Sequence, residues 1–194
     1  MPSDLPNLLT LSRIGAIPLI VMLGLIRLPA GDMAACVVFV LAAVTDWLDG
    51  HLARTRRQTS EFGRMLDPIA DKLLVGATLV LLAGLGRLSD LGLVAAVVIM
   101  LREILVSGLR EYLAGLAHGL PVTRLAKWKT GVQMTAIGML LAGDGSASLL
   151  GLGWLPVQIG GEGLLLVAAA LTLITGWDYL EAGLKHVRSA PAAE

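Results

Sequence analysis

The sequence has little cysteine, few aromatic residues and only scattered histidines. Its one cysteine, Cys36, excludes a disulfide within the chain. The three histidines, at positions 51, 118 and 186, lie far apart, so the chain has no cluster of His and Cys of the kind that binds zinc. Charged residues make up 15% of the chain and aromatic residues 4%, whereas 56% of the residues are hydrophobic. A soluble domain is rarely so apolar.

Long apolar segments account for most of the chain. Six of them are each long enough to cross a hydrocarbon core of roughly 30 Å as a helix; they lie near 8–26, 33–53, 66–86, 91–113, 125–143 and 161–180. The first apolar run follows Asp4 and no basic cluster, which predicts a retained span and not a signal peptide. We therefore predict an all-α, polytopic membrane protein with six transmembrane helices, forming a single domain over residues 1–194.

Basic residues are divided unequally between the two sides of the predicted membrane. With six spans, the termini and the second and fourth connections share one side, which holds eleven Lys and Arg residues. The other side holds Arg27 and Arg87. The positive-inside rule places the rich side in the cytoplasm. We expect a multi-pass protein of the cell inner (cytoplasmic) membrane, surrounded by membrane lipids, with both termini in the cytoplasm and no nucleic-acid partner.

Four aspartates between residues 46 and 71 dominate the polar part of the sequence. Asp46 and Asp49 are three residues apart, and Asp67 and Asp71 are four apart, so each pair lies on one face of its helix and can converge on a common ion. The full pattern is D-x2-D-G-x2-A-R-x8-G-x3-D-x3-D. Gly50 leaves room for a ligand to approach the backbone. These residues predict an active-site cavity that faces the cytoplasm.

This pattern resembles the signature of the CDP-alcohol phosphatidyltransferase family at all eight fixed positions. The resemblance implies an enzyme with two bound divalent cations, and a homodimer. It implies Asp46, Asp49 and Asp67 as metal ligands, with Asp71 as a ligand of the second ion and the general base for the acceptor hydroxyl. The small residues and the arginine of the pattern would shape the site for cytidine and diphosphate; these are Gly50, Ala53, Arg54 and Gly63.

The implied chemistry explains why four carboxylates are needed. Two divalent cations roughly 3.5–4 Å apart can hold the attacking and leaving oxygens of an in-line displacement at phosphorus, and four carboxylates balance their charge. Hard oxygen ligands suit Mg²⁺ or Mn²⁺. A free aspartate is a weak base at neutral pH, and an ion that acidifies the acceptor hydroxyl lessens the demand on it.

Three further segments resemble the phosphatidylglycerophosphate synthase branch of the same family. They are PNLLTLSRI at 6–14, REILVSGLREYL at 102–113 and the cationic stretch that ends in GVQM at 131–134. The resemblance implies transfer of the phosphatidyl group from CDP-diacylglycerol to sn-glycerol 3-phosphate, with release of CMP. An acceptor phosphate needs fixed cations, and the best candidates are Arg110, Lys127 and Lys129.

Two other functions are compatible with parts of the sequence. A sister enzyme with inositol phosphate, serine or phosphatidylglycerol as the acceptor is the nearest alternative. An ion-coupled transporter is the other, because intramembrane charges also mark such proteins. The carboxylates cluster at one cytoplasmic end and not at the midplane, and no inverted repeat is visible, which disfavours a transporter.

Several local alternatives remain open at the level of sequence. Arg13 either lines the site or extends toward lipid headgroups. Glu103, with Ser107 and Arg110 on the same face, forms either a polar stripe toward the aspartates or an ion pair between spans. Lys127 and Lys129 point about 160° apart on a regular helix, so one of them has another role. The segment 143–160 is expected to form a loop or an interfacial stretch.

Overall fold

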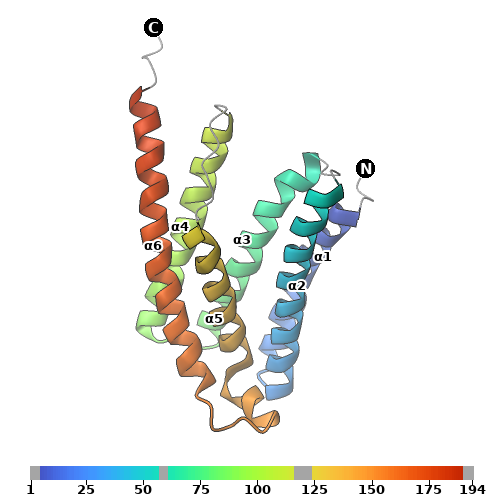
Figure 1. The fold of residues 1–194 in the computed structure, drawn as a ribbon. Coiled ribbons are helices and arrows are strands. Elements are labelled where there is room, and N and C mark those ends of the chain that lie inside the picture. Colours follow the sequence, from blue (N-terminus) through green and yellow to red (C-terminus); the bar gives the residue numbers. More distant parts are fainter. Residues whose placement is uncertain (1–4, 57–60, 116–123, 190–194) are drawn as a thin grey trace.

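In the part of the chain that it describes, the structure, a computed structural model, forms six α-helices (Figure 1). It describes the backbone of residues 5–56, 61–115 and 124–189, and the side chains of residues 8–45, 66–109, 111, 125–177 and 180–181. The helices are α1 (Leu5–Leu25), α2 (Pro29–Arg56), α3 (Glu61–Gly84), α4 (Asp90–Gly115), α5 (Arg124–Leu149) and α6 (Val157–Ser189). These ranges contain no strand, so the predicted all-α fold is confirmed.

The helices run alternately up and down, which brings the start of α1 and the end of α6 to the same end of the bundle (Figure 1). We call this the terminal end; it also holds the end of α2, the start of α3, the end of α4 and the start of α5. The opposite end, here the turn end, holds the short connections α1–α2, α3–α4 and α5–α6. The described helices therefore begin and finish at one end of the bundle, and the side of the membrane on which this end lies stays a prediction.

The α3–α4 connection shows how local sequence ends and restarts a helix. Gly86 has a φ of 69°, a left-handed conformation that glycine adopts without a Cβ penalty. Its N–H donates to the Ala83 carbonyl at 3.0 Å, and the Arg87 N–H donates to the Leu82 carbonyl at 3.0 Å, which closes α3. The Ser89 hydroxyl then accepts from the Gly92 N–H at 3.2 Å and caps α4.

The predicted loop at 143–160 is mostly helical. Gly143 interrupts α5 with a φ of 62° and a ψ of 175°, and the helix then continues to Leu149. Asp144 accepts a hydrogen bond from the Gln158 N–H at 2.9 Å and so caps α6. The connection shrinks to 150–156. Low helix propensity made this glycine-rich segment look like a loop, and contacts with α6 hold it in helical form.

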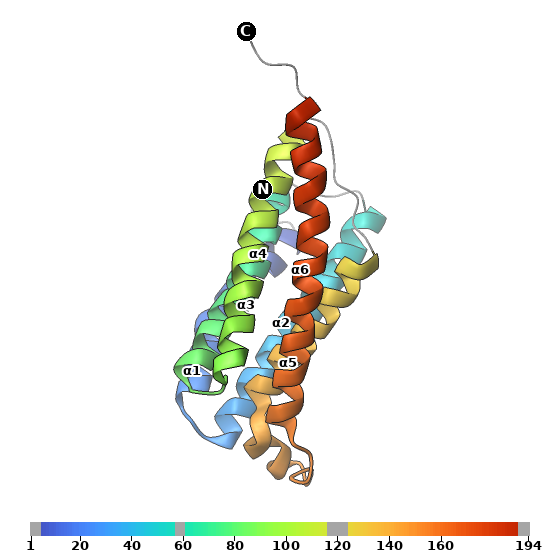
Figure 2. The same ribbon diagram turned by 90° about the vertical axis from the view of Figure 1, so that its left-hand side faces the viewer.

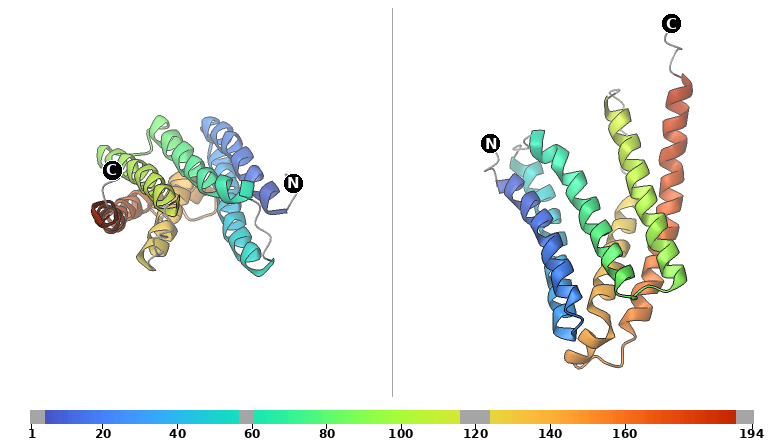
Figure 3. Two further views of the ribbon diagram at one scale, coloured as in Figure 1. Left: turned by 90° about the horizontal axis from the view of Figure 1, so that it is seen from above. Right: turned by 180° about the vertical axis from the view of Figure 1, so that it is seen from behind.

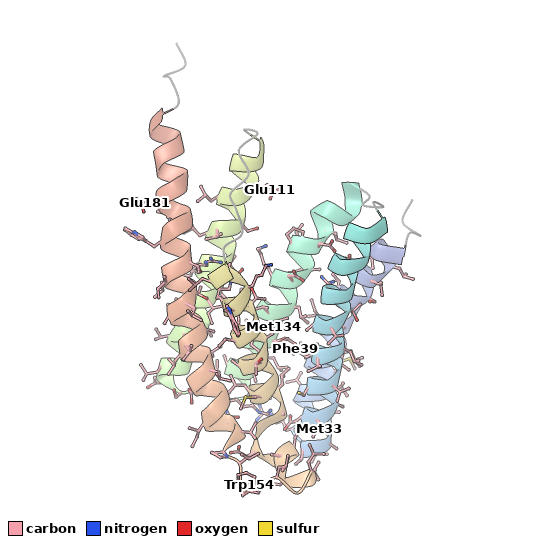
Figure 4. All side chains as sticks on the ribbon, viewed as in Figure 1. Met33, Phe39, Glu111, Met134, Trp154 and Glu181 are labelled. Atoms are coloured by element: carbon pink, nitrogen blue, oxygen red, sulfur yellow. The ribbon has the colours of Figure 1, made fainter. Side chains whose placement is uncertain are left out.

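The six helices form two groups of three. α1 packs against both α2 and α3, whereas α6 packs against both α4 and α5. The α2–α5 contact joins the groups, and α3 touches α4 and α5 only lightly (Figures 2 and 3). One apolar core nevertheless runs through both groups; its most buried large members are Ile20, Phe39, Leu74, Leu82, Ile99, Ile137, Leu140, Leu141 and Leu165. Figure 4 labels Phe39 of α2 and Met134 of α5, which belongs to the partly buried shell of this core.

The outside of the bundle is apolar, as expected of a membrane protein. Large apolar side chains such as Met22, Val80 and Leu101 are at least 65% exposed. Among the described residues, three helices are long and apolar enough to cross a membrane, over Leu8–Leu25, Asp90–Leu109 and Val157–Trp177. The apolar part of α2, Pro29–Thr45, is shorter. A polytopic membrane protein is confirmed, and the crossing of the membrane by all six helices stays a prediction.

Candidate active site

The residues of the aspartate pattern lie on two helices at the terminal end. The last part of α2 carries Asp46, Asp49, Gly50, Ala53 and Arg54, and the first part of α3 carries Gly63, Asp67 and Asp71. Both segments are helical, as the spacing predicted. Of the eight, the structure describes the side chains of Asp67 and Asp71 alone. The convergence of all four carboxylates, and the cavity they would form, stay predictions.

Asp67 and Asp71 are each held by a side chain of α1. The Thr10 hydroxyl donates to Asp67 Oδ1 at 2.5 Å. Arg13 Nη1 donates to Asp71 Oδ1 at 2.8 Å, in an ion pair with the side chain of Arg13 fully buried and that of Asp71 49% exposed. The structure therefore places Arg13 beside the aspartates and not toward lipid headgroups, which settles the alternative left open by the sequence.

The sequence of α1 explains this arrangement. Thr10 and Arg13 are three residues apart and thus share one face of an otherwise apolar helix. Each is only 1% exposed. A buried guanidinium in an apolar helix is very costly without a compensating charge. The sequence signal for a polar contact was the pair of polar residues on one face of the first apolar span, which indicates that a partner exists but does not identify it.

The chemistry of the described donors fits a hard divalent cation. Asp67 and Asp71 lie one turn apart on α3, and each has one oxygen held by α1. Carboxylate oxygens are the ligands that Mg²⁺ and Mn²⁺ prefer. Within the part of the chain that the structure describes, no three His, Cys, Asp or Glu residues come together as a metal site. The two aspartates of α2 would have to complete the ligand set.

A second polar cluster ties α4 to α5 and α6. Glu103 of α4 pairs with Lys129 of α5, which is only 5% exposed. Arg102 donates to Thr175 of α6 at 2.9 Å and approaches Glu103 at 3.4 Å. The ion pair between helices, one of the two alternatives left open for Glu103, is therefore present. The side chain of Arg110 lies outside the described residues, so the polar stripe that would include it stays a prediction.

The structure separates the two lysines that the sequence could not distinguish. Lys129 faces the interior, whereas Lys127 is exposed and lines an open groove of about 500 Å³ along α5 and α6, here called the outer groove. The groove is otherwise lined by Trp128, Gly131, Val132, Thr135 and Leu164. Trp128 is 74% exposed, as expected of a tryptophan at a membrane surface. Only Lys129 is thus buried among the helices.

A third polar cluster, which no sequence pattern predicts, joins four segments at the turn end. Arg87 pairs with Asp32 at the start of α2 and donates to the carbonyls of Leu140 at 3.2 Å and Leu141 at 2.6 Å, just before the interruption of α5. The amide of Gln158 in α6 donates to the Arg87 carbonyl. We call these residues the Arg87 clasp. It lies far along the helices from the aspartates and serves the packing of the bundle.

Comparison with known proteins identifies the family of this chain. The model of the CDP-alcohol phosphatidyltransferase family matches residues 3–176. A Rickettsia bellii protein named CDP-diacylglycerol–glycerol-3-phosphate 3-phosphatidyltransferase is 43% identical over 183 residues, which cover 94% of this chain and 97% of the relative. A protein of the same name from Cereibacter sphaeroides is 40% identical, over 95% of this chain and 97% of the relative.

The likeness extends to plants. An Arabidopsis thaliana protein named CDP-diacylglycerol–glycerol-3-phosphate 3-phosphatidyltransferase 1, chloroplastic/mitochondrial, is 44% identical over 87% of this chain and 59% of the relative. The family model covers the aspartate pattern on α2 and α3 as well as the contacts from α1. This chain is a member of the CDP-alcohol phosphatidyltransferase family.

Proposed function

We propose that the protein transfers the phosphatidyl group of CDP-diacylglycerol to sn-glycerol 3-phosphate, which yields phosphatidylglycerophosphate and CMP. The observation that carries the proposal is the joint presence of the complete aspartate pattern and of relatives with this named activity, similar over almost the whole chain. The product is a phospholipid precursor, so the protein acts in phospholipid biosynthesis. An apolar exterior suits an enzyme whose donor and product are both lipids.

The proposed reaction is an in-line displacement at one phosphorus. The acceptor hydroxyl forms a bond to the phosphorus that carries the diacylglycerol, its proton passes to Asp71, and the bond to the oxygen of CMP breaks. Two divalent cations, Mg²⁺ or Mn²⁺, would be held by Asp46, Asp49, Asp67 and Asp71 and would neutralise the phosphate charge. The site for CDP would be formed by Gly50, Ala53, Arg54 and Gly63.

Binding of glycerol 3-phosphate would rely on cations of α4 and α5. Lys129 is the better of the two lysine candidates, because it lies in the interior, whereas Lys127 lines the outer groove. Arg110, two turns beyond Glu103 on α4, would supply the second cation.

We further propose that the protein lies in the cytoplasmic membrane of the cell with the terminal end in the cytoplasm. The excess of Lys and Arg at that end supports this orientation. It would open the aspartate site to the compartment that supplies glycerol 3-phosphate. By analogy with its family the protein would function as a homodimer, which cross-linking in native membranes tests.

The test is to incubate the purified protein with CDP-diacylglycerol, Mg²⁺ and one acceptor at a time. The acceptors are glycerol 3-phosphate, inositol phosphate, serine and phosphatidylglycerol, and the lipid product is identified by mass spectrometry. We expect phosphatidylglycerophosphate from glycerol 3-phosphate and little product from the others. A different preferred acceptor would reassign the enzyme within its family, and an absence of CMP release with every acceptor would reject a transferase.

A further inference from the structure

The contacts between α1 and α3 reach beyond the aspartate pattern itself. α1 and α3 both start at the terminal end and pack side by side, so they run in the same direction (Figure 1). Thr10 and Arg13 are one turn apart on α1, and their partners Asp67 and Asp71 are one turn apart on α3. The two hydrogen bonds thus connect the parallel helices at two points one turn apart. Each runs from a buried donor to one carboxylate oxygen.

Such a bond fixes the direction in which a carboxylate points. A carboxylate has two oxygens, and a donor that binds Oδ1 at 2.5 or 2.8 Å restrains rotation about the side-chain bonds. The donors are themselves held, because both are 1% exposed and packed between helices. In metal sites, partners of this kind orient the ligands, and their loss typically lowers metal affinity or activity about 10–100-fold.

A role in folding alone explains the pair less well. Buried ion pairs contribute little net stability, because the cost of removing charges from water offsets the attraction. Here Asp71 is 49% exposed, so it stays solvated even without its partner. Burial of the Arg13 side chain costs more free energy than the partial burial of Asp71. This buried arginine contacts a predicted metal ligand.

We propose that Thr10 and Arg13 are positioning residues that hold Asp67 and Asp71 in the direction required for divalent-cation binding. The proposal rests on the proposed function, since the cations belong to that reaction. It gives α1, which carries none of the eight residues of the aspartate pattern, the role of orienting two of the predicted metal ligands. Neither residue touches substrate; both act through the aspartates.

The variants Thr10→Val and Thr10→Ser test the first contact. Valine keeps the shape of threonine and removes the donor, whereas serine keeps the donor. Ser12→Ala is the matched control, because the Ser12 hydroxyl is exposed and donates to the Leu9 carbonyl of its own helix, at 2.8 Å. For the second contact, Arg13→Met removes the charge and Arg13→Lys keeps it. Mn²⁺ binding to the purified proteins is measured by electron paramagnetic resonance, alongside thermal unfolding and CMP release.

We expect Thr10→Val and Arg13→Met to bind Mn²⁺ at least about tenfold more weakly, with unfolding temperatures close to that of the parent protein. Thr10→Ser and Ser12→Ala should bind it within about threefold of the parent, and Arg13→Lys should lie between parent and Arg13→Met. Unchanged Mn²⁺ affinity in Thr10→Val and Arg13→Met would overturn the proposal, as would a loss of affinity that simply follows a loss of folding.

The same measurements separate this proposal from the proposed function. A parent protein that binds Mn²⁺ but releases no CMP would contradict the proposed reaction, while the variants would still decide whether α1 positions the aspartates. A parent protein that binds no Mn²⁺ would overturn both. Addition of Asp67→Asn to Thr10→Val gives a further check, because the two changes should weaken binding less than additively if they act through one carboxylate.

Discussion

Substitution of Asp67 tests the proposed chemistry most directly at the level of single residues. Asp67→Asn keeps the shape of the side chain and removes the charge of a metal ligand. We expect a loss of CMP release greater than the about 10–100-fold typical of residues that only orient a ligand, with the protein still folded. EDTA should abolish the activity of the parent protein in the same way. Near-parental CMP release by Asp67→Asn in the presence of EDTA would mean that no metal is involved.

The two lysines of α5 give a matched pair for the acceptor. Lys129→Gln removes an interior cation, so the KM for glycerol 3-phosphate should rise at least about tenfold, while the KM for CDP-diacylglycerol changes little. Lys127→Gln removes an exposed cation at the outer groove and should leave both constants within about twofold. The opposite ranking of the variants would return the acceptor site to Lys127 and the outside of the bundle.

At the level of helices, the Arg87 clasp should dominate the stability of the turn end. Asp32 is 7% exposed, so Arg87→Met leaves a buried carboxylate and two carbonyls without their cation. Removal of one partner of a buried ion pair costs about 3–5 kcal/mol. Thermal unfolding in detergent should show a markedly lower midpoint. The control is Arg27→Met, in the exposed α1–α2 turn, which should change the midpoint little.

A double variant decides whether the clasp acts through its ion pair. Asp32→Asn combined with Arg87→Met removes the buried charge as well as its partner, so it should recover part of the stability lost in Arg87→Met. An equally unstable double variant would mean that the hydrogen bonds to the Leu140 and Leu141 carbonyls carry most of the effect. An unfolding midpoint of Arg87→Met equal to that of the parent would contradict the clasp.

The helices themselves were largely predictable, because each rests on a long apolar run. The six expected segments correspond to the six helices, and the aspartate pattern lies on helical backbone as its spacing indicated. The segment around Gly143 was less predictable, since its helical form depends on partners such as Gln158 that are remote in sequence. The same reason hid the clasp: sequence marks Arg87 as a charge outside the membrane, and only packing shows that four segments meet on it.

In the site, too, local features were predictable from sequence, whereas contacts between distant residues were not. The aspartates could be named from their spacing, whereas the partner of Arg13 is 58 residues away and no local pattern identifies it. The sequence shows that Lys127 and Lys129 cannot both face inward, but it does not show which one does, because that depends on how α5 packs against α2 and α6. Residue types were thus predictable, and long-range pairs were not.

For the molecule as a whole, orientation in the membrane is the main prediction. Cysteines introduced at Thr59, between α2 and α3, and at Ser89, at the turn end, should react with an impermeant reagent from opposite sides once Cys36 is replaced. The cytoplasmic side should be that of Thr59, because eleven Lys and Arg residues lie on its side and two on the other. Labelling of both positions from one side would contradict the six-span arrangement.

The central claim is that this protein joins glycerol 3-phosphate to the phosphatidyl group of CDP-diacylglycerol. The most direct measurement uses radiolabelled glycerol 3-phosphate with purified protein, CDP-diacylglycerol and Mg²⁺, and follows both the label in extracted lipid and the CMP released. We predict equal amounts of labelled lipid and CMP at every time point, and neither in EDTA. CMP released without incorporation of label, or incorporation that persists in EDTA, would contradict it.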